Sequence, residues 1–210
     1  NKYIIRKKNY INYTNMSSTT KTQPTVDLNR WCYNPNAFST EEIDKIHALA
    51  DTIPFKKATL NSGTNDRDSY RKSEVKWLTQ DIDGIEWLYK KLTALCKKAN
   101  DDFWQFDVDD DLGKLQYGVY YSDGGHYDWH MDVGSGVAAL RKISIVIQLS
   151  DEEEYEGGLF ELFVNRDVIE FPKKKGSITL FPTYCMHRVT PVTAGERRSL
   201  VLWVTGAPFK

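Results

Sequence analysis

Short runs of β-branched and aromatic residues dominate the second half of the chain, from Lys114 onward. They are separated by glycine, proline, asparagine and aspartate, residues that favour turns. This pattern is typical of an antiparallel β sandwich or barrel. The runs are KLQYGVYYS (114–122), RKISIVIQLS (141–150), GLFELFV (158–164), GSITLFP (176–182), HRVTPV (187–192) and RRSLVLWVTG (197–206).

The first half of the chain shows helical periodicity at two places. Ser39 precedes Glu42 by three positions, which is the pattern of a capping box, and apolar residues follow at helical spacing until Pro54. A second apolar stripe at helical spacing runs through residues 85–99. We therefore expect an α+β fold that is mainly β, in which N-terminal supporting helices pack outside a jelly-roll barrel.

The remaining segments set the expected boundaries. Residues 1–27 are polar and aperiodic, which predicts a disordered N-terminal extension. Residues 28–112 are expected to form the helical support and residues 113–210 the β core of one domain. Within the support, residues 55–79 lack a period, which predicts a long loop or a mobile hairpin that could act as a lid. The stretch EYEGG (154–158) is expected to be a turn without chemistry of its own.

Composition and charge narrow the possible function classes. The 210 residues are 40% hydrophobic and carry a formal net charge of -1, with acidic and basic residues mixed along the chain. Such a balance gives no reason to expect a nucleic-acid or membrane partner. The cysteines are three, lie far apart and form no CxxC pair, which is typical of free thiols in the cytoplasm. No apolar run is long enough to span a bilayer.

The stretch GGHYDWHMDVG (124–134) holds two of the four histidines. Residues two apart on a strand face the same side, so His130 and Asp132 can present an imidazole and a carboxylate to one point. His187 lies on another predicted strand of the β half. Two imidazoles and one carboxylate with open positions are the facial triad of non-haem Fe(II) oxygenases. The alternative is a polar cluster at the barrel mouth whose hydrogen bonds are satisfied internally.

Neighbours of these residues leave several assignments open. Asp128 lies as close in sequence to His130 as Asp132 does and competes with it as the carboxylate ligand. His126 is expected to act in a turn or behind the ligands, because a fourth protein ligand would block the open site. Tyr127 and Trp129 are expected either to line the substrate mouth or to pack in the barrel wall.

A basic residue follows the last histidine at a suggestive distance. Arg197 lies ten positions after His187, beyond the predicted hairpin TPVTAGER, so it should stand on the neighbouring strand. Its guanidinium could pair with the far carboxylate of a dicarboxylic acid whose other end chelates the metal. Ser199 should face the same side.

The ordered set HMD, YEGGLFEL, KGSITLFP, HRVTPVTAGER and LVLWV resembles the iron- and 2-oxoglutarate-dependent dioxygenases of the prolyl 4-hydroxylase type, including the microbial PKHD-type hydroxylases. The resemblance covers residues 114–209. It implies a double-stranded β-helix core in which His130, Asp132 and His187 bind Fe(II). It also implies that Arg197 anchors 2-oxoglutarate.

The same resemblance implies three further cosubstrate contacts, from Tyr121, Ser144 and Gln148. Two positions depart from other members. Gln148 stands where a tyrosine is common, and Arg197 stands where the collagen-type enzymes have lysine.

The function implied by the resemblance is hydroxylation of a prolyl residue in a polypeptide, coupled to decarboxylation of 2-oxoglutarate to succinate. Fe(II), 2-oxoglutarate, O2 and L-ascorbate would then take part. The alternative is a cupin-like metal-binding module or isomerase without oxygenase activity, which needs no basic anchor at position 197. A radical halogenase would need a vacancy where Asp132 stands.

Overall fold

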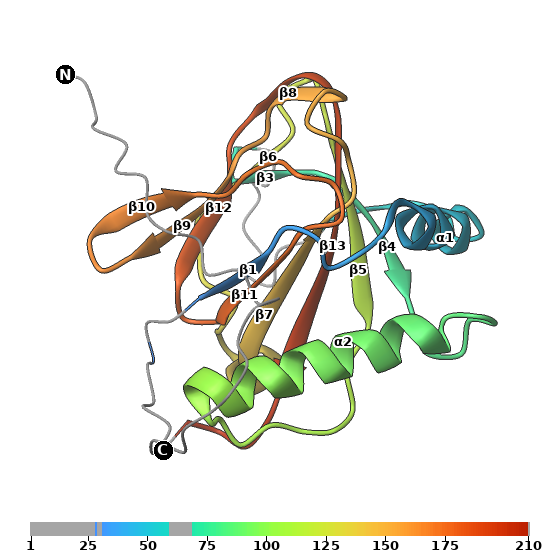
Figure 1. Cartoon of the computed structure of the whole chain (residues 1–210). Helices are drawn as coiled ribbons and strands as arrows, with labels where there is room; N and C mark the ends of the chain where they lie inside the picture. The colour runs from blue at the N-terminus through green and yellow to red at the C-terminus, as the bar shows by residue number, and fades with distance from the viewer. Residues whose placement is uncertain (1–27, 29–30, 59–68, 210) are drawn as a thin grey trace.

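The computed structural model describes residues 28, 31–58 and 69–209, and in them two antiparallel sheets face each other. Both long helices lie outside this pair, on one face of the larger sheet (Figure 1). The mainly β fold with supporting helices that the hydrophobic pattern predicts is therefore confirmed.

The larger sheet contains eight strands, and β8 extends it by pairing with β13 beside the main path. Along this path the order is β1 (Cys32–Asn34), β11 (Ile178–Pro182), β7 (Arg141–Gln148), β13 (Val192–Thr205), β5 (Leu115–Tyr121), β4 (Glu74–Leu78) and β2 (Lys56–Lys57), and the eighth strand is β8 (Tyr155–Gly157).

The smaller sheet contains five strands and holds both histidines of the predicted metal site. Its order is β10 (Asp167–Glu170), β9 (Phe160–Val164), β12 (Met186–Val189), β6 (His126–His130) and β3 (Arg71–Lys72).

Side chains alternate across the larger sheet and divide the interior into two regions. On the helix side, residues such as Leu200, Ile145 and Leu180 join the helices in the main hydrophobic core. Between the two sheets, a second apolar cluster includes Phe160 and Phe181. Polar side chains are buried on this inner face too, which is unusual for a core and indicates a site.

Helix α1 (Thr40–Asp51) begins as the capping-box pattern predicts. The Ser39 hydroxyl accepts from the Glu42 amide, and the Ser39 amide donates to the Glu42 carboxylate at 2.8 Å. Helix α2 (Glu86–Ala99) buries the predicted stripe against the larger sheet and continues into a π-helical turn, η2 (Asn100–Trp104). A short 3-10 helix, η3 (Gly136–Leu140), precedes β7.

The segment 55–79 is not simply a loop, and the expected helical support also contributes strands. The ends of this segment form β2, β3 and β4. Strands β2 and β4 pair antiparallel, as the hairpin alternative predicts, but Val75 and Leu78 are buried, so these ends are not part of a lid. These strands are two to five residues long, too short for a period to show in the sequence. Residues 59–68 and the predicted N-terminal extension, 1–27, lie outside the described residues.

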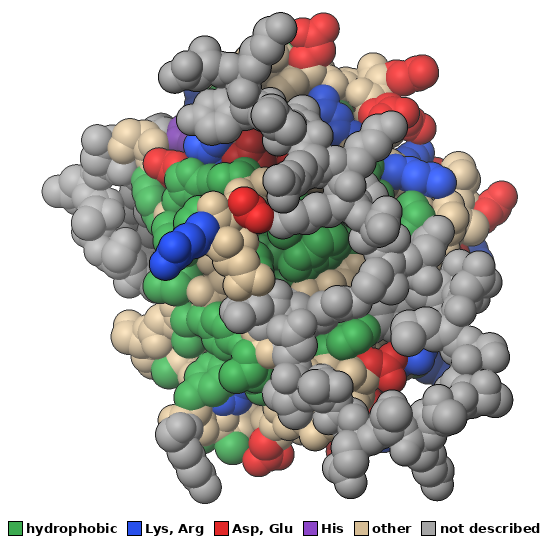
Figure 2. Space-filling model, turned by 60° about the vertical axis from the view of Figure 1, so that its left-hand side comes forward, with side chains coloured by type: hydrophobic (Ala, Val, Ile, Leu, Met, Phe, Trp, Pro, Cys, Tyr) green, Lys and Arg blue, Asp and Glu red, His purple; other side chains and the backbone are tan. Residues whose placement is uncertain are grey.

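The outer face of the smaller sheet carries exposed apolar side chains. Figure 2 shows hydrophobic side chains gathered on the side of the molecule that carries β9, β10 and β12 in Figure 1. Phe163, Val168 and Met186 are among the exposed large apolar residues. In the described ranges, no helix is both long enough and apolar enough to cross a membrane.

Candidate metal centre and anion anchor

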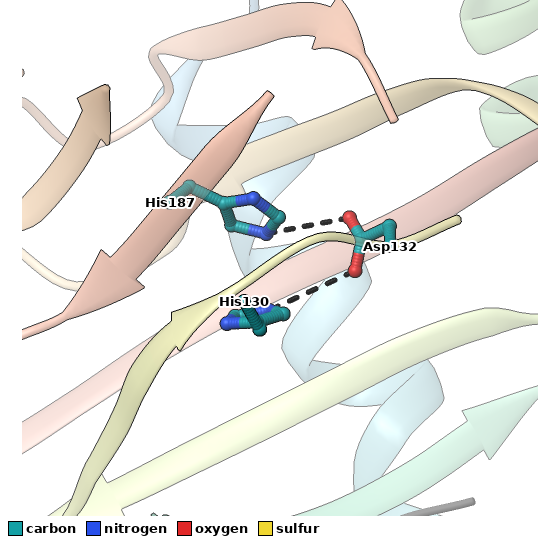
Figure 3. Close-up of side chains that lie close together, drawn as sticks. All are labelled: His130, Asp132 and His187. Atoms are coloured by element: carbon teal, nitrogen blue, oxygen red, sulfur yellow. Dashed lines mark ion pairs between the residues drawn. The ribbon is translucent and has the colours of Figure 1, made fainter. Parts of the chain in front are cut away.

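His130, Asp132 and His187 converge between the sheets (Figure 3). His130 ends β6 and lies directly opposite His187 of β12, so strand pairing brings the two imidazoles together. Asp132 follows two residues later, where its amide donates to the Thr183 carbonyl at 2.9 Å. One ligand atom from each of the three residues lies within 4.8 Å of the others, and all three side chains are buried.

Backbone carbonyls orient both imidazoles. Nδ1 of His130 lies 2.7 Å from the Asp128 carbonyl, and Nδ1 of His187 lies 3.0 Å from the Cys185 carbonyl. A hydrogen on each Nδ1 satisfies these contacts and leaves each Nε2 with a free lone pair. The Nε2 atoms face the Asp132 carboxylate at 3.7 Å from His130 and 3.3 Å from His187.

The protonation states of His130 and Asp132 favour the binding of a cation. Burial lowers the pKa of His130 to about 3, and the neighbouring His187 acts in the same direction. Burial opposes ionisation of Asp132, but the two imidazoles and the Ser144 hydroxyl outweigh it and lower the pKa of Asp132. A neutral imidazole beside an ionised carboxylate is the form in which these residues bind metals. The three residues therefore fit a divalent ion with open positions.

The structure separates the two competing carboxylates. Asp128 is exposed and its side chain accepts a hydrogen bond from the Trp129 amide. Asp132 is buried, and it accepts a hydrogen bond of 2.6 Å from the Ser144 hydroxyl. Ser144, for which the family resemblance implies a cosubstrate contact, holds the Asp132 carboxylate in place.

A β-bulge in β6 decides which neighbours face the triad. His187 pairs with His130 and Val189 pairs with Tyr127, so three steps on β6 oppose two on β12. Because of this extra residue, Tyr127 and His130 share a face, and their rings stack with centroids 3.4 Å apart.

Trp129 is adjacent to His130 and lies on the opposite, outer face, which corrects its expected place at the substrate mouth and leaves the alternative, packing in the barrel wall. Its ring meets Phe163 edge to face and lies 4.7 Å from the Arg188 guanidinium. His126 also turns away from the triad, and its nitrogens lie 2.8 Å from the Gly124 carbonyl and 3.0 Å from the Ser69 carbonyl.

Arg197 lies on β13, on the inner face of the larger sheet, and its residue is 1% exposed. Its Nη1 donates to the Ser199 hydroxyl at 3.3 Å, whereas its Nε has no partner. Among the described residues, no carboxylate forms an ion pair with this guanidinium. A buried charge is costly unless an opposite charge compensates it. The arrangement therefore favours an anionic ligand at Arg197.

Tyr120, rather than Tyr121, accompanies Arg197. The two strands pair Arg197 with Tyr120 and Glu196 with Tyr121, so Tyr121 faces the helix side. Its hydroxyl donates to Glu74 there, and the expected cosubstrate contact of Tyr121 is wrong. The Tyr120 ring lies 5.3 Å from the Arg197 guanidinium carbon, a cation–π geometry. The register needed for this distinction is not encoded in the spacing alone.

The stretch expected to be an inert turn contributes Tyr155, a residue that the sequence pattern did not single out. Tyr155 begins β8, which pairs with the first part of β13. The Gln148 amide nitrogen donates to its hydroxyl at 2.9 Å. Gln148 thus lies on the inner face as predicted, where its amide nitrogen donates to Tyr155 and to the Ser150 carbonyl.

Gly158 lets β8 pack against the anion anchor. Its φ is +57°, and a Cβ built there would lie 3.0 Å from Tyr155 Cε2 and 3.1 Å from Arg197 Cδ. We expect Gly158→Ala to destabilise the fold by about 2 to 5 kcal/mol, combining left-handed backbone strain with overpacking. Equilibrium denaturation measures this loss.

Gly84→Ala is the matched control. Its φ is +80°, but nothing lies within 4 Å of the added Cβ. Only the backbone strain of about 1 to 2 kcal/mol is then expected. Equal losses in the two variants would mean that the packing around Arg197 tolerates a methyl group.

Residues 115–205 match the sequence family described as the 2OG-Fe(II) oxygenase superfamily. A PKHD-type hydroxylase of Synechococcus sp. (strain CC9605) is 37% identical over 84 residues, which cover 40% of this chain and 38% of that protein. A PKHD-type hydroxylase of Hyphomonas neptunium is 37% identical over 91 residues, which cover 40% of each chain. The chain thus matches less than half of the length of these relatives.

Two solved structures are similar over most of the chain. A prolyl-4-hydroxylase of Pseudomonas putida superposes with a TM-score of 0.68 at 19% identity, covering 84% of this chain and 92% of that one. A prolyl hydroxylase from Trichoplax adhaerens, in complex with a peptide fragment of the hypoxia inducible factor oxygen degradation domain, gives 0.71 at 19% identity, covering 85% and 84%. At this identity the likeness shows a shared fold.

Proposed function

We propose that the protein is an Fe(II)- and 2-oxoglutarate-dependent dioxygenase, because residues 115–205, which carry the triad, match the 2OG-Fe(II) oxygenase superfamily. Its reaction would hydroxylate a prolyl residue within a polypeptide. The observation that carries the proposal is the placement of a buried Arg197, which has no carboxylate partner among the described residues, on one sheet and of a buried His-Asp-His triad on the other.

His130, Asp132 and His187 would hold Fe(II), which supplies the capacity to couple oxidative decarboxylation of 2-oxoglutarate to hydroxylation of a C–H bond. The balance is one substrate, one O2 and one 2-oxoglutarate consumed for one hydroxylated product, one succinate and one CO2. L-Ascorbate would serve as an auxiliary reductant.

The chain's own residues would orient the cosubstrate and shield the site. Arg197 and Ser199 would bind the distal carboxylate, since a guanidinium matches a carboxylate in geometry and charge. Ser144 fixes Asp132, and the Tyr127 ring covers one face of the His130 imidazole. Burial of all three ligands keeps water from competing for them.

A prolyl substrate is supported by the two similar solved structures, which are both described as prolyl hydroxylases, and by the residues around the triad. Beside the triad, Arg141 stacks on Trp203 with its guanidinium carbon 4.0 Å from the ring, and its Nη1 donates to the Asp132 carbonyl. Aromatic and cationic groups of this kind suit a proline ring and the carbonyls of an extended chain.

The three cysteines are free and buried, which agrees with the reducing, cytoplasmic location proposed from the sequence.

The substrate class is tested by incubating the protein with Fe(II), 2-oxoglutarate and ascorbate and a panel of proline-containing peptides, free amino acids and nucleosides. We expect a mass gain of one oxygen on peptides only, with stoichiometric succinate. Product formed solely from free metabolites or nucleosides would contradict the peptide substrate while leaving the oxygenase chemistry intact.

A further inference from the structure

Tyr155 is held tightly beside the anion anchor. Its residue is 4% exposed, and Lys173 covers its ring with Nζ 4.2 Å from the centroid while also donating to the Tyr155 carbonyl. The Cβ position of Gly158 lies within 3.1 Å of atoms of both Tyr155 and Arg197, so both side chains border the same small space.

The hydrogen bonds around Tyr155 leave one proton without an acceptor. Gln148 Nε2 donates to the Tyr155 hydroxyl at 2.9 Å and to the Ser150 carbonyl at 3.1 Å, which uses both hydrogens of the amide. The Tyr155 oxygen is therefore an acceptor in this bond. Among the described residues, no group accepts the hydroxyl hydrogen of Tyr155.

The hydroxyl is a neutral donor rather than a phenolate. Burial raises the pKa of Tyr155, although the nearby Arg197 partly opposes this shift. A buried donor without an acceptor costs free energy unless a ligand supplies one. The same holds for Arg197, whose Nε is also unsatisfied. Two neighbouring groups with unused donors point to one shared acceptor.

We propose that the Tyr155 hydroxyl donates to the distal carboxylate of 2-oxoglutarate alongside Arg197, and that Gln148 is the positioning residue that orients this hydroxyl. The inference rests on the proposed function. This arrangement accounts for the glutamine at position 148. The Gln148 amide on β7 orients the Tyr155 hydroxyl, and Tyr155 on β8 contacts the ligand.

The chemistry of a carboxylate accommodates this arrangement. An ionised carboxylate offers about four lone-pair sites, and a bidentate guanidinium occupies two of them. A phenol hydroxyl and the Ser199 hydroxyl can occupy the others. A ligand that lacks the distal carboxylate gains nothing from Tyr155.

The test is the binding of 2-oxoglutarate to the Mn(II)-loaded full chain, measured by isothermal titration calorimetry without turnover. Tyr155→Phe is expected to weaken 2-oxoglutarate binding by roughly 10- to 100-fold, the range for a hydrogen bond to a charged group. The affinity for 2-oxopentanoate, which lacks the distal carboxylate, should not change. A general loss of structure would weaken both ligands.

Two further variants complete the design. Tyr117→Phe is the matched control, because its hydroxyl is also buried and bonded, to His47 at 2.8 Å, but on the helix side of the sheet; it should leave both affinities unchanged. Gln148→Leu should weaken 2-oxoglutarate binding about threefold to tenfold and spare 2-oxopentanoate, since only the orientation of the hydroxyl is lost.

The outcomes separate this inference from the proposed function. If the wild-type chain binds 2-oxoglutarate and Tyr155→Phe binds it equally well, the role of Tyr155 is overturned and the oxygenase proposal stands. If the wild-type chain does not bind 2-oxoglutarate, both fail. Should Tyr155→Phe not fold, an unchanged ratio of the two affinities in Gln148→Leu overturns the inference.

Discussion

The His187→Ala protein is expected to lose 2-oxoglutarate turnover by roughly 1,000-fold or more while keeping its fold. Loss of a ligand removes a stabilisation of several kcal/mol from the reaction, and each 1.4 kcal/mol corresponds to a factor of ten in rate. His187 is buried against Phe181, with ring centroids 4.8 Å apart, so the truncation also leaves a cavity. Succinate formation and Mn(II) titration measure the loss, and circular dichroism reports the fold.

His47→Ala is the control for this experiment. It removes an imidazole of comparable size from α1, on the helix side of the larger sheet, where His47 contacts Tyr117 rather than the triad. We expect unchanged metal binding and turnover. Full activity in His187→Ala would refute the assignment of the triad.

Arg197→Met is expected to weaken 2-oxoglutarate binding by roughly 30- to 1,000-fold, because losing a partner of a buried charge pair costs about 2 to 5 kcal/mol. Methionine keeps most of the packing over Tyr120 but removes the charge. The ligand-free variant should be as stable as the wild-type chain or more so, since it removes a buried guanidinium that has no ion pair within the described part of the chain. Calorimetry with 2-oxoglutarate and denaturant unfolding measure the two effects.

The adjacent arginine supplies a matched control. Arg198 faces the opposite side of β13, where its Nε lies 2.6 Å from Glu196 Oε1. Arg198→Met should leave 2-oxoglutarate affinity unchanged. A larger loss of affinity in Arg198→Met than in Arg197→Met would move the anchor by one residue.

Much of the site could be predicted because its ligands sit on regular strands at recognisable spacings. The sequence alone identifies the pair His130 and Asp132, the histidine at position 187, and the basic residue ten positions after it. The match of residues 115–205 to the 2OG-Fe(II) oxygenase superfamily agrees with the family resemblance, and the structural neighbours share the fold. The main hydrophobic core was also predictable, because its apolar residues recur along the sequence at the spacing of ordinary helices and strands.

The failures concern register, which spacing does not specify. Counting by twos from His130 places His126 on the same face and Tyr127 on the other, but the bulge in β6 adds one residue and exchanges their faces. The predicted cosubstrate contact of Tyr121 is wrong for a related reason. Which of the two adjacent tyrosines faces Arg197 depends on how β5 pairs with β13. Tyr155 was missed because a three-residue strand next to two glycines looks like a turn.

The division of the site between two sheets has a mechanical consequence. The histidines lie on the smaller sheet and Arg197 lies on the larger one. The proposed cosubstrate would therefore link the two sheets while it is bound. Its binding free energy would then add to that of folding, by about 2.7 kcal/mol at a concentration one hundred times the dissociation constant. In a cell with little 2-oxoglutarate, the protein would lack this added stability, and its two sheets would separate more often.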